Sequence, residues 1–157
     1  SSGLYYLNYD DGGSYWSMTV RPGLAASIPM GQTSDYRNSQ VMQDMYFYVP
    51  KGTRNIEYYY TRTAFHPGGP HDVIGPDGKL QKSVDVNGDY VSVPVPTGMD
   101  GKLWRFHQPV LGFFWFNNVP NYLAASPEAL LVPREVVARD GLAVEHSSQP
   151  VVVPAEK

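Results

Sequence analysis

The chain has 157 residues, of which 42% are apolar and 17% charged, so it has the length of one domain and is neither a disordered polyelectrolyte nor a membrane protein. Its net charge is −3 and its 12 lysines and arginines are scattered, which excludes the basic patch that nucleic-acid binding requires. Cysteine is absent, which excludes a disulfide framework, thiolate zinc sites and a cysteine nucleophile.

No apolar run reaches the length of a bilayer span, and no signal-peptide pattern opens the chain. We therefore expect a soluble domain that contacts no membrane, with Ser1, Ser2 and Gly3 as a remnant of an expression tag. Twelve tyrosines suit pleated strands, and 15 glycines with 14 prolines supply turns, so the composition favours sheet over helix.

Strands are expected wherever apolar and aromatic runs are bounded by turn residues. In chain order these runs are residues 4–9, 14–20, 43–49, 55–61, 71–75, 80–86, 89–95, 102–107 and 111–117. Asn87-Gly88 predicts the clearest hairpin, which joins 80–86 to 89–95.

Helix is expected only as short turns within 126–139, where Ser126-Pro127 is a helix-start pattern. Residues 142–157 are expected to form a tail or a last edge strand. Many short strands at this spacing predict a single all-β domain, a two-sheet antiparallel β-sandwich of jelly-roll type.

Two histidines and a carboxylate lie close together in the sequence at His66, His71 and Asp72. Prolines and glycines separate the two histidines, so no strand or helix spacing directs them to one point, and we expect an ordinary polar loop. A metal site or a small polysaccharide lyase that uses His66, His71, His107 and Tyr59 is kept as an alternative.

No nucleophile elbow is present, and most acidic residues lie in turns, where they commonly bond their own backbone. We therefore expect no enzymatic activity and no catalytic residue. The turn acids Asp10, Asp11 and Asp100 can instead supply oxygen ligands to a structural calcium ion, but plain β-turns are the favoured explanation, because no twelve-residue calcium loop is present.

Alternation along 43–49 and 55–61 separates a core face from an outer face. The core set is Met45, Phe47 and Val49 with Ile56, Tyr58 and Tyr60. If the two strands pair through the turn at Lys51-Gly52, Tyr46, Tyr48 and Tyr59 share one outer face.

An exposed aromatic row can stack on sugar rings, and neighbouring polar groups can bond the hydroxyls. Arg62, Arg105 and His107 are the candidate polar partners. The alternative is that these tyrosines pack under a loop or against another domain.

The three tryptophans differ in their surroundings. Trp16 and Trp104 alternate with other apolar residues and are expected in the core. Trp115 lies in a run that is apolar on both faces, so it is either a core residue or a ligand contact.

Several motifs resemble the ancillary β-sandwich domains, carbohydrate-binding modules among them, of large secreted bacterial polysaccharide-degrading enzymes. The motifs are Tyr46–Thr53, Gly75–Lys79, Gly101–Phe106, Asn118–Pro120 and Leu131–Glu135, within residues 42–137. The resemblance implies a non-catalytic, secreted, carbohydrate-binding module that targets an appended enzyme to a polysaccharide. It also implies a possible structural calcium. The alternative is a structural domain that packs against the catalytic domain of a parent enzyme.

Overall fold

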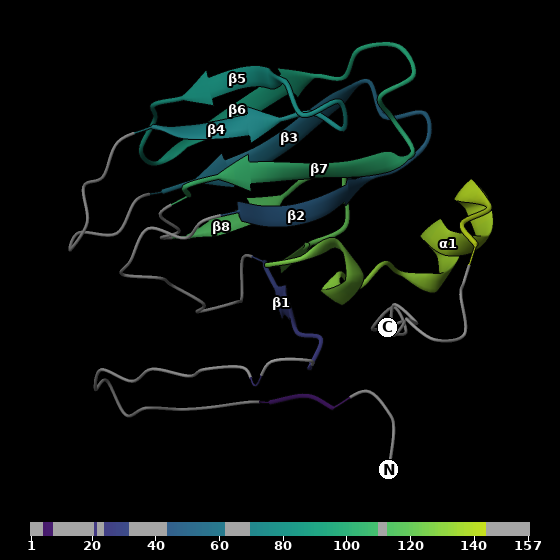
Figure 1. Cartoon of the computed structure of the whole chain (residues 1–157). Coiled ribbons are helices and arrows are strands. Elements are labelled where there is room, and N and C mark those ends of the chain that lie inside the picture. Colours follow the sequence, from purple (N-terminus) through teal and green to yellow (C-terminus); the bar gives the residue numbers. More distant parts are fainter. Residues whose placement is uncertain are drawn as a thin grey trace.

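A computed structural model describes residues 5–7, 21, 24–31, 44–61, 70–109 and 113–143. Within these residues nine strands form two antiparallel sheets, and Figure 1 shows the sheets as two layers, with β3, β6 and β8 behind β2, β4 and β7. The expected all-β sandwich is confirmed.

The six-stranded sheet has the order β1-β9-β2-β7-β4-β5. Its strands are β1 (Ser27–Pro29), β9 (Tyr122–Ala124), β2 (Asp44–Val49), β7 (Lys102–His107), β4 (His71–Ile74) and β5 (Leu80–Val84). The three-stranded sheet has the order β6-β3-β8, with β6 (Asp89–Pro94), β3 (Asn55–Tyr60) and β8 (Phe114–Phe116).

The core lies between the two sheets and is rich in aromatic rings. The core faces expected from alternation in β2 and β3 are confirmed, because all six of those side chains are at most 2% exposed. Phe47 stacks on Phe106 with ring centroids 4.7 Å apart and lies 4.9 Å from Phe116 of the other sheet. Rings at these separations interlock the two layers.

Two of the expected strand pairings are wrong. The Lys51-Gly52 turn connects β2 to β3, and Asn87-Gly88 connects β5 to β6, but in each case the two strands belong to different sheets. The hairpin that does form joins β4 to β5 through residues 75–79. Its backbone closes with two hydrogen bonds, from Gly75 N to Lys79 O and from Gly78 N to Gly75 O.

Most of the other expected elements are present, with different ends. β8 is shorter than the expected 111–117, and β1 and β9 were not expected at all. Residues 5–7 form no strand, and the remainder of the strands expected at 4–9 and 14–20 lies outside the described residues, as do Trp16 and residues 144–157.

The helical turns expected near the C-terminus are confirmed as a 3-10 turn at Pro127–Ala129 and helix α1 at Arg134–Asp140. Residues 127–140, which we call the C-terminal segment, cover part of the outer face of the six-stranded sheet. The segment forms a second apolar cluster, in which Leu130 and Val132 pack with Tyr48 and Ala124. Figure 1 shows α1 beside the end of the sheet where β2 finishes and β7 begins.

Candidate functional site

Three aromatic side chains lie side by side across the outer face of the three-stranded sheet. Tyr59 of β3 is paired directly with Tyr90 of β6 on one side and with Trp115 of β8 on the other. The Tyr59 and Trp115 rings stack with centroids 4.3 Å apart and planes 17° apart. Tyr90 meets Tyr59 edge-on at 5.2 Å. We call Tyr90, Tyr59 and Trp115 the aromatic row.

Strand alternation explains why this row faces outward. Tyr58 and Tyr60, on either side of Tyr59, are 0% and 1% exposed in the core. Tyr59 and Trp115 are half-buried, whereas Tyr90 is 60% exposed at the edge of the sheet. Because Tyr59 and Trp115 stack face to face, Tyr90 is the most exposed ring of the row. The row carries two phenolic groups as polar groups, whereas the Trp115 Nε1 atom is buried.

Polar side chains continue the same outer face. Glu57 precedes Tyr59 by two residues on β3, and its cross-strand neighbour is Ser92 of β6; both are exposed. Gly88 lies close to the other end, because a Cβ atom there would be 3.7 Å from Tyr59 Oη. The row therefore has hydrogen-bonding groups beside it on the surface.

The expectation that Tyr46, Tyr48 and Tyr59 share one face is wrong. β2 and β3 lie in different sheets, so Tyr46 and Tyr48 are on the opposite side of the sandwich from Tyr59. Tyr46 is half-buried, and Tyr48 is only 3% exposed because the C-terminal segment covers it. Tyr48 cannot stack on a ligand while that segment is in place.

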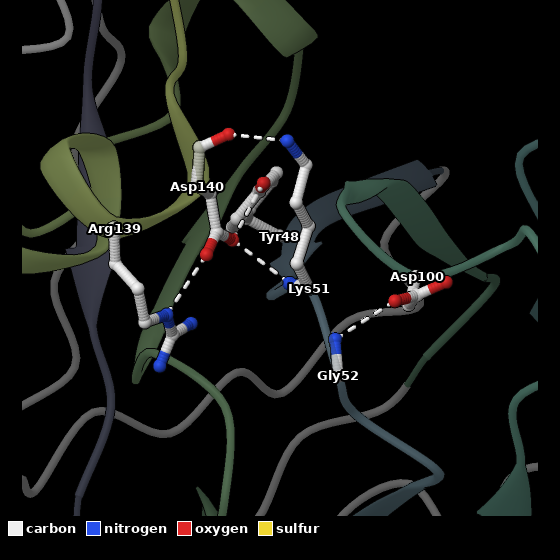
Figure 2. Close-up of polar contacts among 6 residues, drawn as sticks. All are labelled: Tyr48, Lys51, Gly52, Asp100, Arg139 and Asp140. Atoms are coloured by element: carbon white, nitrogen blue, oxygen red, sulfur yellow. Dashed lines mark hydrogen bonds and ion pairs between the residues drawn. The ribbon is translucent and has the colours of Figure 1, made fainter.

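Tyr48 instead belongs to a hydrogen-bonded cluster around the buried carboxylate of Asp140 (Figure 2). Tyr48 Oη donates to Asp140 Oδ2 at 2.9 Å, and the Lys51 amide donates to the same oxygen at 2.8 Å. Arg139 Nε donates to Oδ1 at 2.8 Å, and Lys51 Nζ donates to the Asp140 carbonyl oxygen at 2.6 Å. These contacts fasten the end of α1 to the end of β2.

The pKa of Asp140 reflects this cluster. Burial alone would raise the pKa of the carboxyl group, but the hydrogen bonds from Arg139, the Lys51 amide and Tyr48 outweigh it and hold the pKa below the ordinary value. For Tyr48, burial and the Asp140 carboxylate raise the pKa well above its usual range.

A carboxyl group whose pKa is lower in the folded state stabilises the fold above its unfolded pKa of about 3.9, and the contribution is lost as the pH falls below that value. We therefore expect the free energy of unfolding of the unsubstituted protein to fall more steeply between about pH 5 and pH 2 than that of Asp140→Asn. Urea titrations across this range measure both slopes. Equal slopes would show that Asp140 keeps an ordinary pKa.

Arg105 and His107 lie on the outer face of the six-stranded sheet, where both contact Asp44. Arg105 forms an ion pair with Asp44 Oδ2, and His107 Nδ1 lies 2.7 Å from Asp44 Oδ1. Burial tends to raise the pKa of Asp44, but hydrogen bonds with His107 and Arg105 and their charges bring it below the ordinary value. Arg105 and His107, predicted as ligand contacts, thus form a polar cluster with Asp44 in a different sheet from the aromatic row.

The described residues of the lyase or metal hypothesis, which are His71, His107 and Tyr59, do not converge. His71 is buried between the sheets, with Nε2 2.8 Å from Tyr58 Oη, whereas Tyr59 and His107 lie on the outer faces of different sheets. Asp100 accepts a 2.8 Å hydrogen bond from the Gly52 amide, so its carboxylate supports a turn, as Figure 2 shows. Asp10, Asp11, Arg62 and His66 lie outside the described residues.

Within the described part of the chain, no cluster of three or more His, Cys, Asp or Glu side chains is arranged to hold a metal ion. No helix there is both long enough and apolar enough to cross a membrane.

Comparison with models of protein families, with curated proteins and with solved structures finds no match for the chain.

Sequence reasoning selected Tyr59 and Trp115 but missed Tyr90. The signal for Tyr90 was present in the alternation of 89–94, where Val91 and Val93 are buried while Tyr90 and Ser92 are exposed. The cross-strand pairing that places Tyr90 beside Tyr59 could not be predicted in the same way, because 89–95 was expected to pair with 80–86.

Proposed function

We propose that this domain binds carbohydrate through the aromatic row. The observation that carries the proposal is the placement of three aromatic rings on directly paired positions of the outer face of one sheet. A pyranose ring has a face of C–H groups that packs on a π-surface, while its hydroxyl groups bond to polar neighbours. The exposed Tyr90 ring is the part of the row most open to a sugar face, and the exposed side chains of Glu57 and Ser92 lie beside the row on the same outer face.

The shape of the row favours an extended glycan over a single enclosed sugar. Adjacent strands lie about 4.8 Å apart, so three side chains on three neighbouring strands span about 10 Å across a surface with no enclosing wall of its own. Such a platform suits a polysaccharide that lies across several strands. A small ligand would instead need a concave pocket that buries most of its surface.

In this role the domain is a non-catalytic module of a secreted polysaccharide-degrading enzyme. It holds the enzyme at its polymer, which raises the local substrate concentration without taking part in the reaction. The motifs that resemble those of ancillary sandwich domains support this role.

A structural calcium ion bound at Asp10 and Asp11 remains part of the proposal. Because such an ion binds the folded state only, it would raise the free energy of unfolding by mass action.

Replacing a ring of the aromatic row should weaken binding. We expect Tyr59→Ala or Trp115→Ala to reduce the binding free energy for a retained polysaccharide by about 1–2 kcal/mol, the scale of one lost aromatic contact. Affinity electrophoresis against a polysaccharide panel identifies the retained polymer, and titration calorimetry gives the loss.

Tyr46→Ala is the matched control, because Tyr46 is also a half-buried strand tyrosine but lies in the other sheet. Its affinity should equal that of the unsubstituted protein. If Tyr46→Ala lost affinity and Tyr59→Ala did not, the glycan would bind the six-stranded sheet, and the proposed surface would be wrong.

A second candidate role is that of a structural domain that packs against the catalytic domain of a parent enzyme. It is favoured by the exposure of Tyr6, Leu7 and Leu24, which are 61%, 68% and 68% exposed. The same screen separates the two roles, because a purely structural domain is retarded by no polysaccharide in the panel.

A further inference from the structure

A shallow groove of about 390 Å³ lies at the end of the sandwich where β2 connects to β3. The connecting turn forms one wall with Lys51 and Arg54, while Asn118 and Arg139 line the other parts. Glu57 of β3 also lines the groove. This position is away from the core and open to solvent.

More cations than carboxylates line the groove itself, while the carboxylates of Asp100 and Asp140 lie at its edge, where they accept from the Gly52 and Lys51 amides. Lys51, Arg54 and Arg139 line it against the single carboxylate of Glu57. Arg139 pairs with Asp140, but Lys51 Nζ donates to a neutral carbonyl oxygen, and Arg54 forms no ion pair with the described residues. Two of the three cations therefore lack a carboxylate partner within the described part of the chain.

The Asp140 cluster positions one of these cations before any ligand arrives. Lys51 is held at both ends, since its amide donates to the Asp140 carboxylate and its Nζ donates to the Asp140 carbonyl, as Figure 2 shows. A cation fixed in this way loses little side-chain entropy on binding an anion. It retains donors for a ligand, because an ammonium group has three.

The groove is continuous with the aromatic row along β3. Glu57 lines the groove, and Tyr59 stands two residues further on the same outer face, which corresponds to about 6.6 Å along the strand. Asn118, which follows β8, lies beside β3 at the groove. Its side chain accepts a hydrogen bond from the Glu57 amide at 3.0 Å and donates one to the Asn55 carbonyl at 2.7 Å. Charged groups on a polymer that lies across the row can thus reach the edge of the groove at Glu57.

We infer that the polysaccharide bound by the aromatic row is anionic, with carboxylate or sulfate groups held by Arg54 and Lys51 in this groove. The inference rests on the proposed function, because the row supplies the stacking that holds the chain. A planar guanidinium binds carboxylate or sulfate oxygens through two parallel N–H groups. Neutral polymers can accept only ordinary hydrogen bonds from the two cations and lack the charge attraction.

The test compares three anionic polymers with their neutral counterparts. Polygalacturonate and alginate are each paired with the carboxyl-reduced polymer, and dextran sulfate is paired with dextran, so the panel distinguishes carboxylate from sulfate. We expect at least one anionic polymer to bind about tenfold more tightly than its counterpart at low salt, and the preference to shrink as NaCl is added.

Arg54→Gln should lower the affinity for that polymer about five- to tenfold and leave the affinity for its neutral counterpart unchanged. Arg134→Gln is the control, because Arg134 is exposed at the start of α1, outside the groove, and its replacement makes the same change in net charge. It should leave both affinities unchanged.

Three outcomes would overturn the inference and leave carbohydrate binding intact: no anionic polymer preferred over its counterpart, no effect of Arg54→Gln, or an equal loss in Arg134→Gln. The last of these would show a general attraction to net charge. If no polysaccharide were bound, or if Tyr59→Ala bound every polymer normally, the proposed function itself would fail.

Discussion

Trp104→Ala is expected to cost about 3–5 kcal/mol of the free energy of unfolding, which is a large part of the stability of an ordinary domain. Trp104 is 1% exposed in the core between the sheets. Its Nε1 donates a 2.9 Å hydrogen bond to the Met99 carbonyl. The substitution therefore leaves a cavity and removes the hydrogen-bond partner of a carbonyl group.

Urea unfolding followed by circular dichroism measures this cost, and Trp115→Ala is the comparison. Trp115 is half-buried on an outer face, so its removal should cost about 1–2 kcal/mol in stability, while it lowers glycan affinity directly. Trp104→Ala should bind glycan normally in its folded fraction. Equal losses of stability in the two variants would mean that Trp115 is as much a core residue as Trp104.

The assignment of the core face of each strand could be made from the sequence. Side chains alternate across a strand whatever its partners are, so Met45 and Phe47 in β2 or Ile56 and Tyr58 in β3 are assigned to the core face from local order alone. The same local rule identified Trp104 as a core residue.

The pairing of strands could not be predicted in this way. Gly52 and Gly88 have φ of +82° and +75°, as their turn motifs predict. A turn reverses the chain, but whether the next strand bonds to the previous one or crosses to the other sheet depends on packing far away in the sequence. Local turn chemistry was therefore right about the backbone and wrong about the partner of β3 and β6.

In the aromatic row, too, the direction of a side chain could be predicted from local sequence but its neighbours on other strands could not. Tyr59 was placed outward correctly from alternation, but its true neighbours, Tyr90 and Trp115, follow from the pairings of β3 with β6 and β8. Tyr48 was also placed on an outer face correctly, yet it is buried because residues near 130–140 fold back over that face. Burial of an outer face by a distant segment leaves no local signal in the strand itself.

Asp140→Ala, which removes the polar contacts of that covering segment, is expected to destabilise the protein by about 2–4 kcal/mol. The substitution removes the acceptor for Tyr48 Oη, the Lys51 amide and Arg139 Nε together. The Tyr48 hydroxyl is then buried without its acceptor, and burying an unsatisfied polar group carries most of the cost. The Arg139 contact adds little, because the Arg139 side chain is 57% exposed.

Thermal and urea unfolding of Asp140→Ala, Tyr48→Phe and the double variant measure how much of this loss in the free energy of unfolding comes from the contact between Tyr48 and Asp140. Tyr48→Phe removes only the hydroxyl and should cost about 1 kcal/mol. In the double variant no hydroxyl remains to be left unsatisfied, so its cost should be smaller than the sum of the two single costs. Additive costs, or a melting temperature of Asp140→Ala equal to that of the unsubstituted protein, would show that Tyr48 and Asp140 are not coupled. The C-terminal segment would then be held over the sheet by the apolar packing of Leu130 and Val132 alone.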